Sequence, residues 1–236
     1  GGGYEPQTPI YGSSEILLDQ VGPESHSFLD LSYDDKFAFQ VDGVVSDNES
    51  RRLIEFTEQL GFRDAAPGIQ TPPGMRQNRT VHWMAPPQDV EILFSRVRRF
   101  VPPVLDGHES MGALSHRLNT YRYTAGQQFR PHLDGDWPGY RVDPKTKQLE
   151  CWKTGRSMLS MLLYLNGRED GVQDGDTLLL DGERVVKRVV PRSGRALFFR
   201  HGMHPRSVLH AGDILGSGAA KYVIRINVMY QSQING

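Results

Sequence analysis

The sequence has very little cysteine and no excess of either charge, and each scarcity excludes a class of protein. Cys151 is the only cysteine among 236 residues, so an intrachain disulfide, a cysteine-based zinc site and an iron–sulfur cluster are excluded. This also favours a reducing compartment, cytoplasmic or nuclear. The 27 Lys and Arg residues against 28 Asp and Glu residues give a net charge of −1, which argues against a nucleic-acid partner because phosphate binding rewards a concentrated basic surface.

Long apolar runs are also missing. No stretch approaches the roughly 20 residues that a helix needs to cross a bilayer, so no membrane partner is expected for this chain. The opening Gly1-Gly2-Gly3-Tyr4 lacks the basic and apolar regions of a signal peptide. The composition, with 38% hydrophobic residues, 25 Gly and 15 Pro, is instead typical of a turn-rich globular domain that buries a full core.

The chain divides into an arm, a helical part and a β part. Residues 1–30 mix Gly, Pro, Ser and Gln without periodicity, which predicts an extended or flexible arm. Residues 31–236 are expected to form a single domain, because β architectures of this length are usually one unit. Within it we predict helical support over 46–102 and a β core over 113–230.

Two amphipathic helices are predicted in the first half. Ser46-Asp47-Asn48-Glu49 has the pattern of a capping box, which indicates that a helix begins here, and Gly61 is expected to end it. The apolar stripe of this helix consists of Leu53, Ile54, Phe56 and Leu60. A second stripe repeats at helical spacing and predicts a helix from about Gln88 until Pro102. This stripe consists of Val90, Leu93, Phe94, Val97 and Val101.

After Gly112 the sequence changes to short extended segments separated by Gly, Pro and Asp, which predicts a sandwich, barrel or jelly roll. The expected strands, including one before the helices, are 37–41, 116–123, 157–165, 176–180, 185–190, 196–200 and 221–230. In the last strand Lys221, Val223, Arg225 and Asn227 share one face. Buried cations on an otherwise apolar strand need an anionic partner to offset the cost of desolvation.

Two segments without periodicity carry charged and aromatic residues. Arg76-Gln77-Asn78-Arg79 follows a Pro-rich stretch and is predicted to be a loop whose basic residues face solvent or a cleft. Residues 135–155 form a long polar insertion, which we interpret as a substrate lid. Substrate recognition is expected in loops such as 66–80 and 135–155.

A candidate metal site begins at His132-Leu133-Asp134, where an imidazole and a carboxylate two residues apart project from one face of an extended segment. The triplet is common by chance, so its context must decide. His210 lies 78 residues downstream of His132. Two imidazoles and one carboxylate on one face of an octahedron leave three positions open, as in the non-haem Fe(II) oxygenases.

Two assignments stay open at this level. His201 and His204 lie close to His210 in the sequence and are rivals for the third ligand position. Lys221 and Arg225 are both candidates to bind an anion, such as the distal carboxylate of a dicarboxylic acid. Arg225 offers a planar fork that suits a carboxylate, whereas Lys221 comes first on the strand and is preferred.

The segment from Tyr123 to Asp134, Tyr-Thr-Ala-Gly-Gln-Gln-Phe-Arg-Pro-His-Leu-Asp, resembles the Tyr-x-x-Gly-Gly-x-Tyr-x-Pro-His-x-Asp segment of prolyl 4-hydroxylase-type 2-oxoglutarate/Fe(II)-dependent dioxygenases. Further segments agree in order with this family, namely 161–166, 175–177, 190–199, 210–212 and 218–222. The resemblance covers about residues 35–230. Two departures are Gln127 in place of the second glycine and a gap from His210 to Lys221 that is one residue longer than in collagen-type members.

This resemblance implies a mainly β fold with flanking helices, a double-stranded β-helix or jelly roll of the cupin-like type. It implies that His132, Asp134 and His210 are the catalytic residues that hold Fe(II). O₂ would bind at a remaining position on the metal, and ascorbate is a further candidate cofactor.

The resemblance also implies a site for 2-oxoglutarate, the co-substrate. Its far carboxylate would pair with Lys221, or with Arg225 if that assignment is reversed, aided by the hydroxyls of Tyr123 and Thr177. Oxidative decarboxylation of 2-oxoglutarate would then drive hydroxylation of the substrate.

The expected function is therefore Fe(II)/2-oxoglutarate-dependent hydroxylation of an unactivated C–H bond, most like that of a prolyl or other peptide side-chain hydroxylase. The expected partner is a peptide, a protein or a small molecule. One alternative keeps the reaction but acts on a small molecule or a nucleobase. Another is a catalytically silent jelly-roll binding module that kept the fold and lost turnover.

Overall fold

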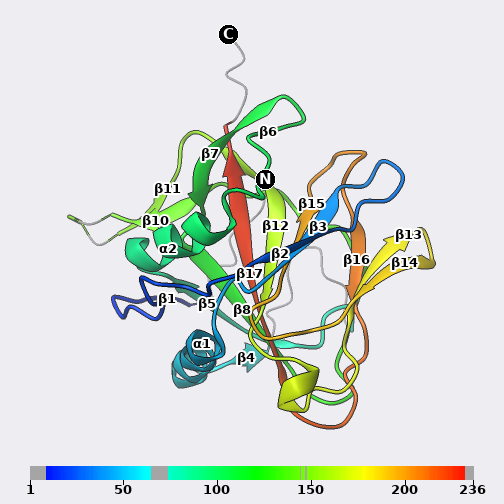
Figure 1. Ribbon diagram of the computed structural model, residues 1–236. Coiled ribbons are helices and arrows are strands. Elements are labelled where there is room, and N and C mark those ends of the chain that lie inside the picture. The colour runs from blue at the N-terminus through cyan, green and yellow to red at the C-terminus, as the bar shows by residue number, and fades with distance from the viewer. Residues whose placement is uncertain (1–8, 65–73, 144, 147, 232–236) are drawn as a thin grey trace.

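The computed structural model describes residues 9–64, 74–143, 145–146 and 148–231, which form two packed sheets with helices on one side (Figure 1). The small sheet has the order β14 (Arg184–Val189), β13 (Thr177–Asp181), β16 (Leu209–Gly212) and β9 (Phe129–His132). The central path of the large sheet is β1 (Ile10–Gly12), β5 (Arg79–Met84), β8 (Arg117–Tyr123), β17 (Lys221–Tyr230), β12 (Arg156–Tyr164), β15 (Ala196–Arg200), β3 (Ala38–Asp42) and β2 (Ser27–Asp30). This mainly β, jelly-roll arrangement confirms the predicted fold class.

The remaining elements extend the large sheet or lie outside it. The short strands β4 (Arg63–Asp64), β6 (Val104–Leu105) and β7 (His108–Leu114) lie off the central path. A separate hairpin is formed by β10 (Tyr140–Val142) and β11 (Leu149–Cys151), and a single 3₁₀ turn, η1, spans Arg168–Asp170. The hairpin lies within the predicted insertion, whose role as a lid stays a prediction.

The two α-helices of the described residues are α1 (Asp47–Leu60) and α2 (Pro87–Val97). The predicted capping box of α1 is present, with Ser46 accepting from the Glu49 N–H and Glu49 accepting from the Ser46 N–H. Helix α2 is shorter than predicted, because the chain leaves the α-helix after Val97 and forms tight i to i−3 turns before Pro102. Neither helix is long and apolar enough to span a membrane.

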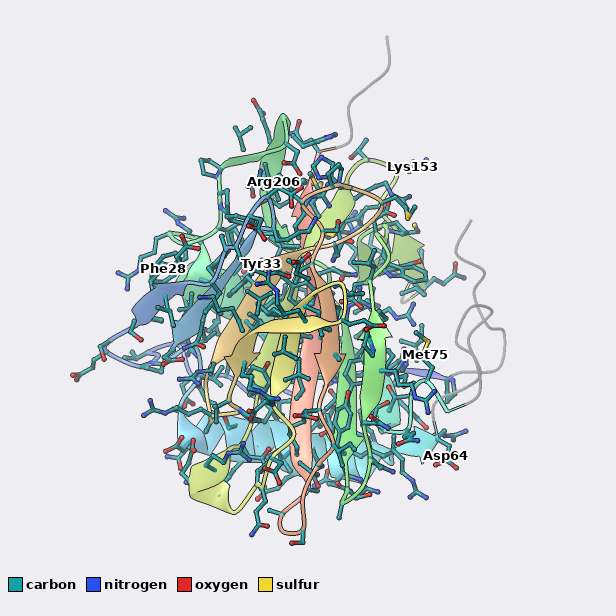
Figure 2. The ribbon with its side chains drawn as sticks, turned by 90° about the vertical axis from the view of Figure 1, so that its right-hand side faces the viewer. Phe28, Tyr33, Asp64, Met75, Lys153 and Arg206 are labelled. Carbon is teal, nitrogen blue, oxygen red and sulfur yellow. The ribbon has the colours of Figure 1, made fainter. Side chains whose placement is uncertain are left out.

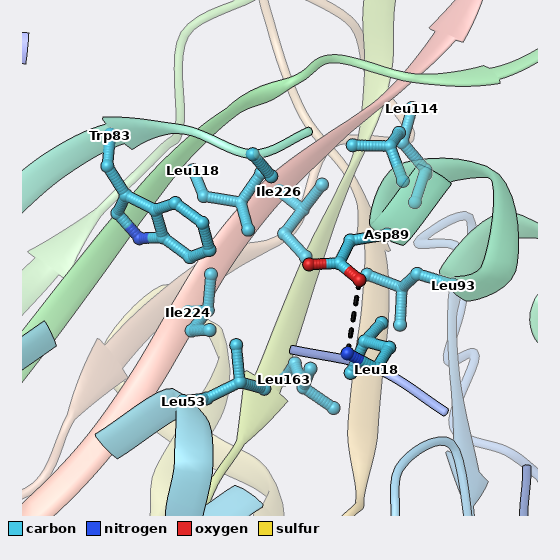
Figure 3. A pocket seen from close by; sticks show the side chains of 12 residues that line it. Leu18, Leu53, Trp83, Asp89, Leu93, Leu114, Leu118, Leu163, Ile224 and Ile226 are labelled. Atoms are coloured by element: carbon cyan, nitrogen blue, oxygen red, sulfur yellow. Dashed lines mark hydrogen bonds between the residues drawn. The ribbon is translucent and has the colours of Figure 1, made fainter. Parts of the chain in front are cut away.

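The largest apolar core lies between the helices and the large sheet, where side chains from α1, α2, β5 and β17 meet (Figure 3). One buried carboxylate in this region has hydrogen-bond partners on the backbone. The Asp89 carboxylate accepts from the backbone N–H groups of Leu17 and Leu18, at 3.0 and 3.1 Å. Residues 9–30, part of the predicted extended or flexible arm, are therefore attached to the domain.

The strands predicted from long apolar or alternating patterns are present, and β15 and β17 have the predicted bounds. On β17 the apolar side chains Ile224, Ile226 and Val228 pack into the core, and Lys221 and Arg225 lie on the opposite face. The prediction of a loop over residues 76–79 is wrong at its end, because Arg79 begins β5 and pairs with Arg122. The boundary was missed because the polar–apolar alternation of β5 follows directly on a Pro-rich stretch, which reads as a loop. Part of that stretch lies outside the described residues.

Candidate metal centre

The three predicted metal ligands meet on the small sheet. His132 ends β9 and His210 lies in β16, and the two residues are directly opposite one another in the pairing of these strands. Asp134 follows His132 by two residues. Ligand atoms from all three side chains lie within 4.8 Å of one another, so a single ion can contact all of them.

Hydrogen bonds orient both imidazoles for metal binding. The Nδ1 atom of His132 lies 2.9 Å from the carbonyl oxygen of Arg130, and that of His210 lies 3.2 Å from the carbonyl oxygen of Val208. Because a carbonyl only accepts, each Nδ1 carries the proton and each Nε2 keeps a free lone pair. These Nε2 atoms lie 3.6 and 3.9 Å from the Asp134 carboxylate oxygens. Two neutral imidazoles and a carboxylate suit Fe(II).

The Asp134 carboxylate is buried, and one of its oxygens is fully engaged with the large sheet. Its Oδ2 atom accepts from the Ser160 hydroxyl at 2.6 Å and from the Arg225 Nε at 3.0 Å. Burial alone would raise the pKa of this carboxyl, but the Arg225 guanidinium holds it well below its usual range. Asp134 is therefore an anion, and its Oδ1 atom is left to face the site.

His201, one rival for the third ligand position, belongs to a hydrogen-bonded chain behind Asp134. The Trp137 N–H donates to Ser157 Oγ at 2.9 Å, and the Ser157 hydroxyl donates to His201 Nε2 at 2.9 Å. His201 Nδ1 then donates to Ser160 Oγ at 2.8 Å, and Ser160 donates to Asp134. Burial lowers the pKa of His201 to about 3, so the ring is neutral. Sequence reasoning missed this chain because its members are far apart in sequence.

His204, the other rival, lies outside the cluster. Its Nδ1 atom is 3.5 Å from the Asp106 carboxylate and accepts from the backbone N–H of Arg206. Among the described residues, the group with metal-ligand geometry consists of His132, Asp134 and His210. The structure therefore favours His210 over both rivals.

A pocket extends from the three ligands into the space between the sheets, and the predicted 2-oxoglutarate residues line it. Lys221 lies in it with only 2% of its surface exposed. Its ammonium donates to the carbonyl of Gly175 and lies 4.4 Å from the centre of the Tyr123 ring. The Thr177 hydroxyl, also in the pocket, accepts from the Tyr164 hydroxyl at 2.7 Å. Burial lowers the pKa of Lys221 to about 8.

Lys221 and Arg225 have different surroundings although they share a face of β17. Arg225 is paired with Asp134 and also donates to the carbonyl of Gly135. Lys221 donates to a neutral carbonyl, and no carboxylate of the described residues forms an ion pair with it as Asp134 does with Arg225. A dicarboxylate that reaches from the metal into the pocket would supply that missing partner.

Comparison with known proteins agrees with this geometry. Residues 118–229 match the family model described as the 2OG-Fe(II) oxygenase superfamily. This range contains the three candidate ligands together with Lys221 and Arg225. A search of curated protein sequences found no match.

Several solved structures have a similar fold. A viral collagen prolyl hydroxylase from Paramecium Bursaria Chlorella virus-1, in complex with 2OG, has 21% identity and a TM-score of 0.55, over 82% of this chain and 96% of that one. A Pseudomonas putida prolyl-4-hydroxylase has 17% identity and a TM-score of 0.55, over 81% and 91%. A Trichoplax adhaerens prolyl hydroxylase, in complex with a hypoxia inducible factor peptide fragment, has 15% identity and a TM-score of 0.50, over 87% and 83%.

Proposed function

We propose that the protein, whose residues 118–229 match the family model of the 2OG-Fe(II) oxygenase superfamily, is a dioxygenase that hydroxylates an unactivated C–H bond of a peptide, with a prolyl residue as the preferred target. The observation that carries the proposal is the ligand cluster of His132, Asp134 and His210, whose atoms lie within 4.8 Å of one another. It lies at one end of a pocket that holds a buried cation, Lys221.

The residues of the chain divide the work of the site. His132, Asp134 and His210 would hold Fe(II) through two Nε2 atoms and Oδ1, while Arg225 and Ser160 keep the carboxylate of Asp134 in place. When bound, Fe(II) with 2-oxoglutarate and O₂ supplies the oxidising chemistry that converts C–H to C–OH and releases succinate and CO₂.

The pocket beyond the metal fits 2-oxoglutarate. Lys221 would pair with the far carboxylate of the co-substrate, and Tyr123 and Thr177 lie beside it with hydroxyl groups. Burial raises the pKa of Tyr123, so this hydroxyl stays protonated and can donate. Burial of the whole pocket excludes water and strengthens the ion pair.

The peptide target is supported by the names of the similar structures. They are prolyl hydroxylases from a virus, a bacterium and an animal, and one of them holds a peptide fragment. In this chain the 135–155 insertion begins directly after Asp134, and its backbone at Trp137 is bonded to Ser157. We assign this insertion the role of a lid over the substrate.

The test is spectroscopic and anaerobic. We expect Fe(II) and 2-oxoglutarate together to give a metal-to-ligand charge-transfer band, and His132→Ala to lose it. Lys221→Met should keep Fe(II) and weaken 2-oxoglutarate binding by about tenfold or more, since a charge-assisted pair is lost. Arg225→Met should weaken Fe(II) binding instead, and the exposed Lys187→Met serves as the matched control.

Two outcomes would contradict the proposal. Absence of the band in folded, metal-bound protein would support the silent binding module. Loss of 2-oxoglutarate affinity in Arg225→Met, with normal affinity in Lys221→Met, would reverse the assignment of the two cations. With the band established, succinate release on proline-containing peptides tests the target.

A further inference from the structure

The large sheet presents an unusual polar row on the face that carries the metal centre. The register places His82 of β5 beside Asn119 of β8, and Asn119 beside Arg225 of β17. Residues paired in this way point to the same side of a sheet. Because Arg225 contacts Asp134, the row faces the metal centre. On the other side of β5, Val81 and Trp83 pack into the apolar core.

Three side chains, two from the segment just before β5 and one from its second residue, extend this polar face and hold buried groups without partners. Asn78 and Thr80 are 1% and 4% exposed. Among the described residues, no hydrogen-bond partner is present for Asn78 Nδ2, Thr80 Oγ1 or Arg76 Nη2. Burying such groups unpaired costs free energy, so a ligand that accepts hydrogen bonds is expected to satisfy them.

The orientation of these donors is set by the residues themselves. Arg76 Nε donates to Asn78 Oδ1 at 2.8 Å, which determines which end of the amide is oxygen. Asn78 Nδ2 and Arg76 Nη2 are then both donors, and the Thr80 hydroxyl can donate as well. Arg76 Nη2 and Asn78 Nδ2 belong to two side chains that are already hydrogen-bonded to each other, and such a pair of donors matches the two oxygens of a carboxylate.

The charge around this group is positive. The guanidinium of Arg76 lies 4.3 Å from the centre of the Tyr121 ring, and within the described residues it contacts Asn78 and aromatic rings rather than a carboxylate. Arg117 donates to His82 Nδ1 at 2.8 Å. Burial lowers the pKa of His82 to about 3, and the charges of Arg117, Arg76 and Arg225 add to this effect. A neutral histidine among three cations adds no charge of its own.

Arg76 lies close to the metal centre. Its guanidinium is 5.4 Å from the centre of the Phe129 ring, and that ring stacks on His132 with centroids 3.6 Å apart. Met75, labelled in Figure 2, accepts from the Arg130 N–H at 2.9 Å. The segment before β5 is therefore attached to the strand that carries His132.

From these contacts we propose that Arg76, Asn78 and Thr80 form a carboxylate-binding subsite for the substrate to be hydroxylated. The inference rests on the proposed oxygenase function and names its substrate class: a molecule with a carboxylate near the reacting C–H bond. The subsite is separate from the Lys221 end of the pocket, since Lys221 lies beside Tyr123 and Arg76 covers Tyr121. The carboxylate belongs either to a chain terminus or to an acidic side chain.

Binding measurements with three probes test the subsite without turnover. The protein is loaded with Zn(II) and 2-oxoglutarate, so that the Lys221 end is filled, and the Arg76 Nε–H resonance is followed by NMR. N-acetylproline carries a terminal carboxylate, N-acetyl-glutamyl-prolinamide carries a side-chain carboxylate, and N-acetylprolinamide carries none. We expect one of the two acids to bind about tenfold or more tightly than N-acetylprolinamide, and the preferred acid identifies the source.

Variants of two arginines on opposite faces separate the subsite from general charge. Arg76→Gln should abolish the preference for the acid, and Arg76→Lys should retain part of it because the charge remains without the fork. Arg79→Gln is the matched control, since Arg79 is exposed and pairs with Asp64. For the control variant we expect an unchanged preference, measured from the Arg76 resonance as in the wild type; in the Arg76 variants, affinity is measured from the probe's own resonances.

Three results would overturn the subsite: equal affinity for the acids and the amide, a preference that persists in Arg76→Gln, or no binding of either acid. Failure of the oxygenase function has a different signature, the absence of the charge-transfer band with Fe(II) and 2-oxoglutarate in the wild-type protein. The two failures are therefore distinguishable.

Discussion

At the scale of single residues, the candidate metal centre is defined as much by the atoms behind the ligands as by the ligands. The Nδ1 atom of each histidine is hydrogen-bonded to the carbonyl two residues earlier in the chain, and Oδ2 of Asp134 accepts from Ser160 and Arg225. Such contacts set the tautomer and the direction of a ligand before metal arrives. The site is therefore preorganised by neighbours that no metal-binding motif contains.

Ser160→Ala removes the hydroxyl that links Asp134 to the neutral ring of His201. We expect Fe(II) affinity to fall by roughly tenfold to a hundredfold, because the carboxylate keeps its charge and loses one of its two restraints. Anaerobic Fe(II) titration measures the change, and circular dichroism verifies that the fold is retained. Ser95→Ala, which removes a hydroxyl bonded to its own helix, is the control; equal affinity in both variants would contradict the positioning role.

At the scale of elements, a buried ion pair joins the two helices to the arm. Arg96 of α2 donates to both carboxylate oxygens of Glu49 of α1, at 2.8 and 3.0 Å. Glu49 also accepts from the N–H groups of Ser46 and Asp19. Burial opposes ionisation of Glu49, but these donors keep its pKa below the ordinary value. This ion pair thus holds the helices together against the apolar face of the large sheet. Arg225 lies on the other face of the same sheet.

Arg96→Met should destabilise the protein by about 3–5 kcal/mol at neutral pH, because it leaves a buried carboxylate without its counter-ion. Urea denaturation measures the loss, and a variant with Met at both positions should recover most of it. Because folding lowers the pKa of Glu49, the stability from its ionisation is present above the ordinary pKa of 4.5 and is lost as the pH falls below that value. The difference in free energy of unfolding between wild type and Arg96→Met should therefore become smaller as the pH falls below 4.5. A difference that stays the same would contradict this account.

At the scale of the whole molecule, the site connects the two sheets. His132 and His210 belong to strands of the small sheet, whereas the side chains that restrain Asp134 belong to β12 and β17 of the large sheet. An ion held by all three ligands therefore links the two layers. Metal binding and global stability should be coupled.

Anaerobic Fe(II) at about a hundred times its dissociation constant should stabilise the folded protein by about 2.7 kcal/mol. For a domain of this size that corresponds to a rise in Tm of roughly 5–10 °C. Differential scanning calorimetry with and without Fe(II) measures the shift, and a chelator should reverse it. His132→Ala should show little of it; a shift of the same size in that variant would mean that the ion binds elsewhere.

The sequence by itself determined the features that depend on local pattern: the capped helix α1, the bounds of β15 and β17, and the pairing of His132 with Asp134 two residues apart. It did not indicate the four-residue strands β9 and β16, because so few residues carry no periodicity and are extended only through pairing with neighbours. Because side chains alternate between the two faces of a strand, the sequence placed Lys221 and Arg225 on one face, but it left open which of them binds the co-substrate. Only the tertiary structure distinguishes the surroundings of these two cations: Asp134 contacts Arg225, and Lys221 lies in the pocket without such a contact among the described residues. The contact with Arg225 joins residues 91 positions apart in the chain.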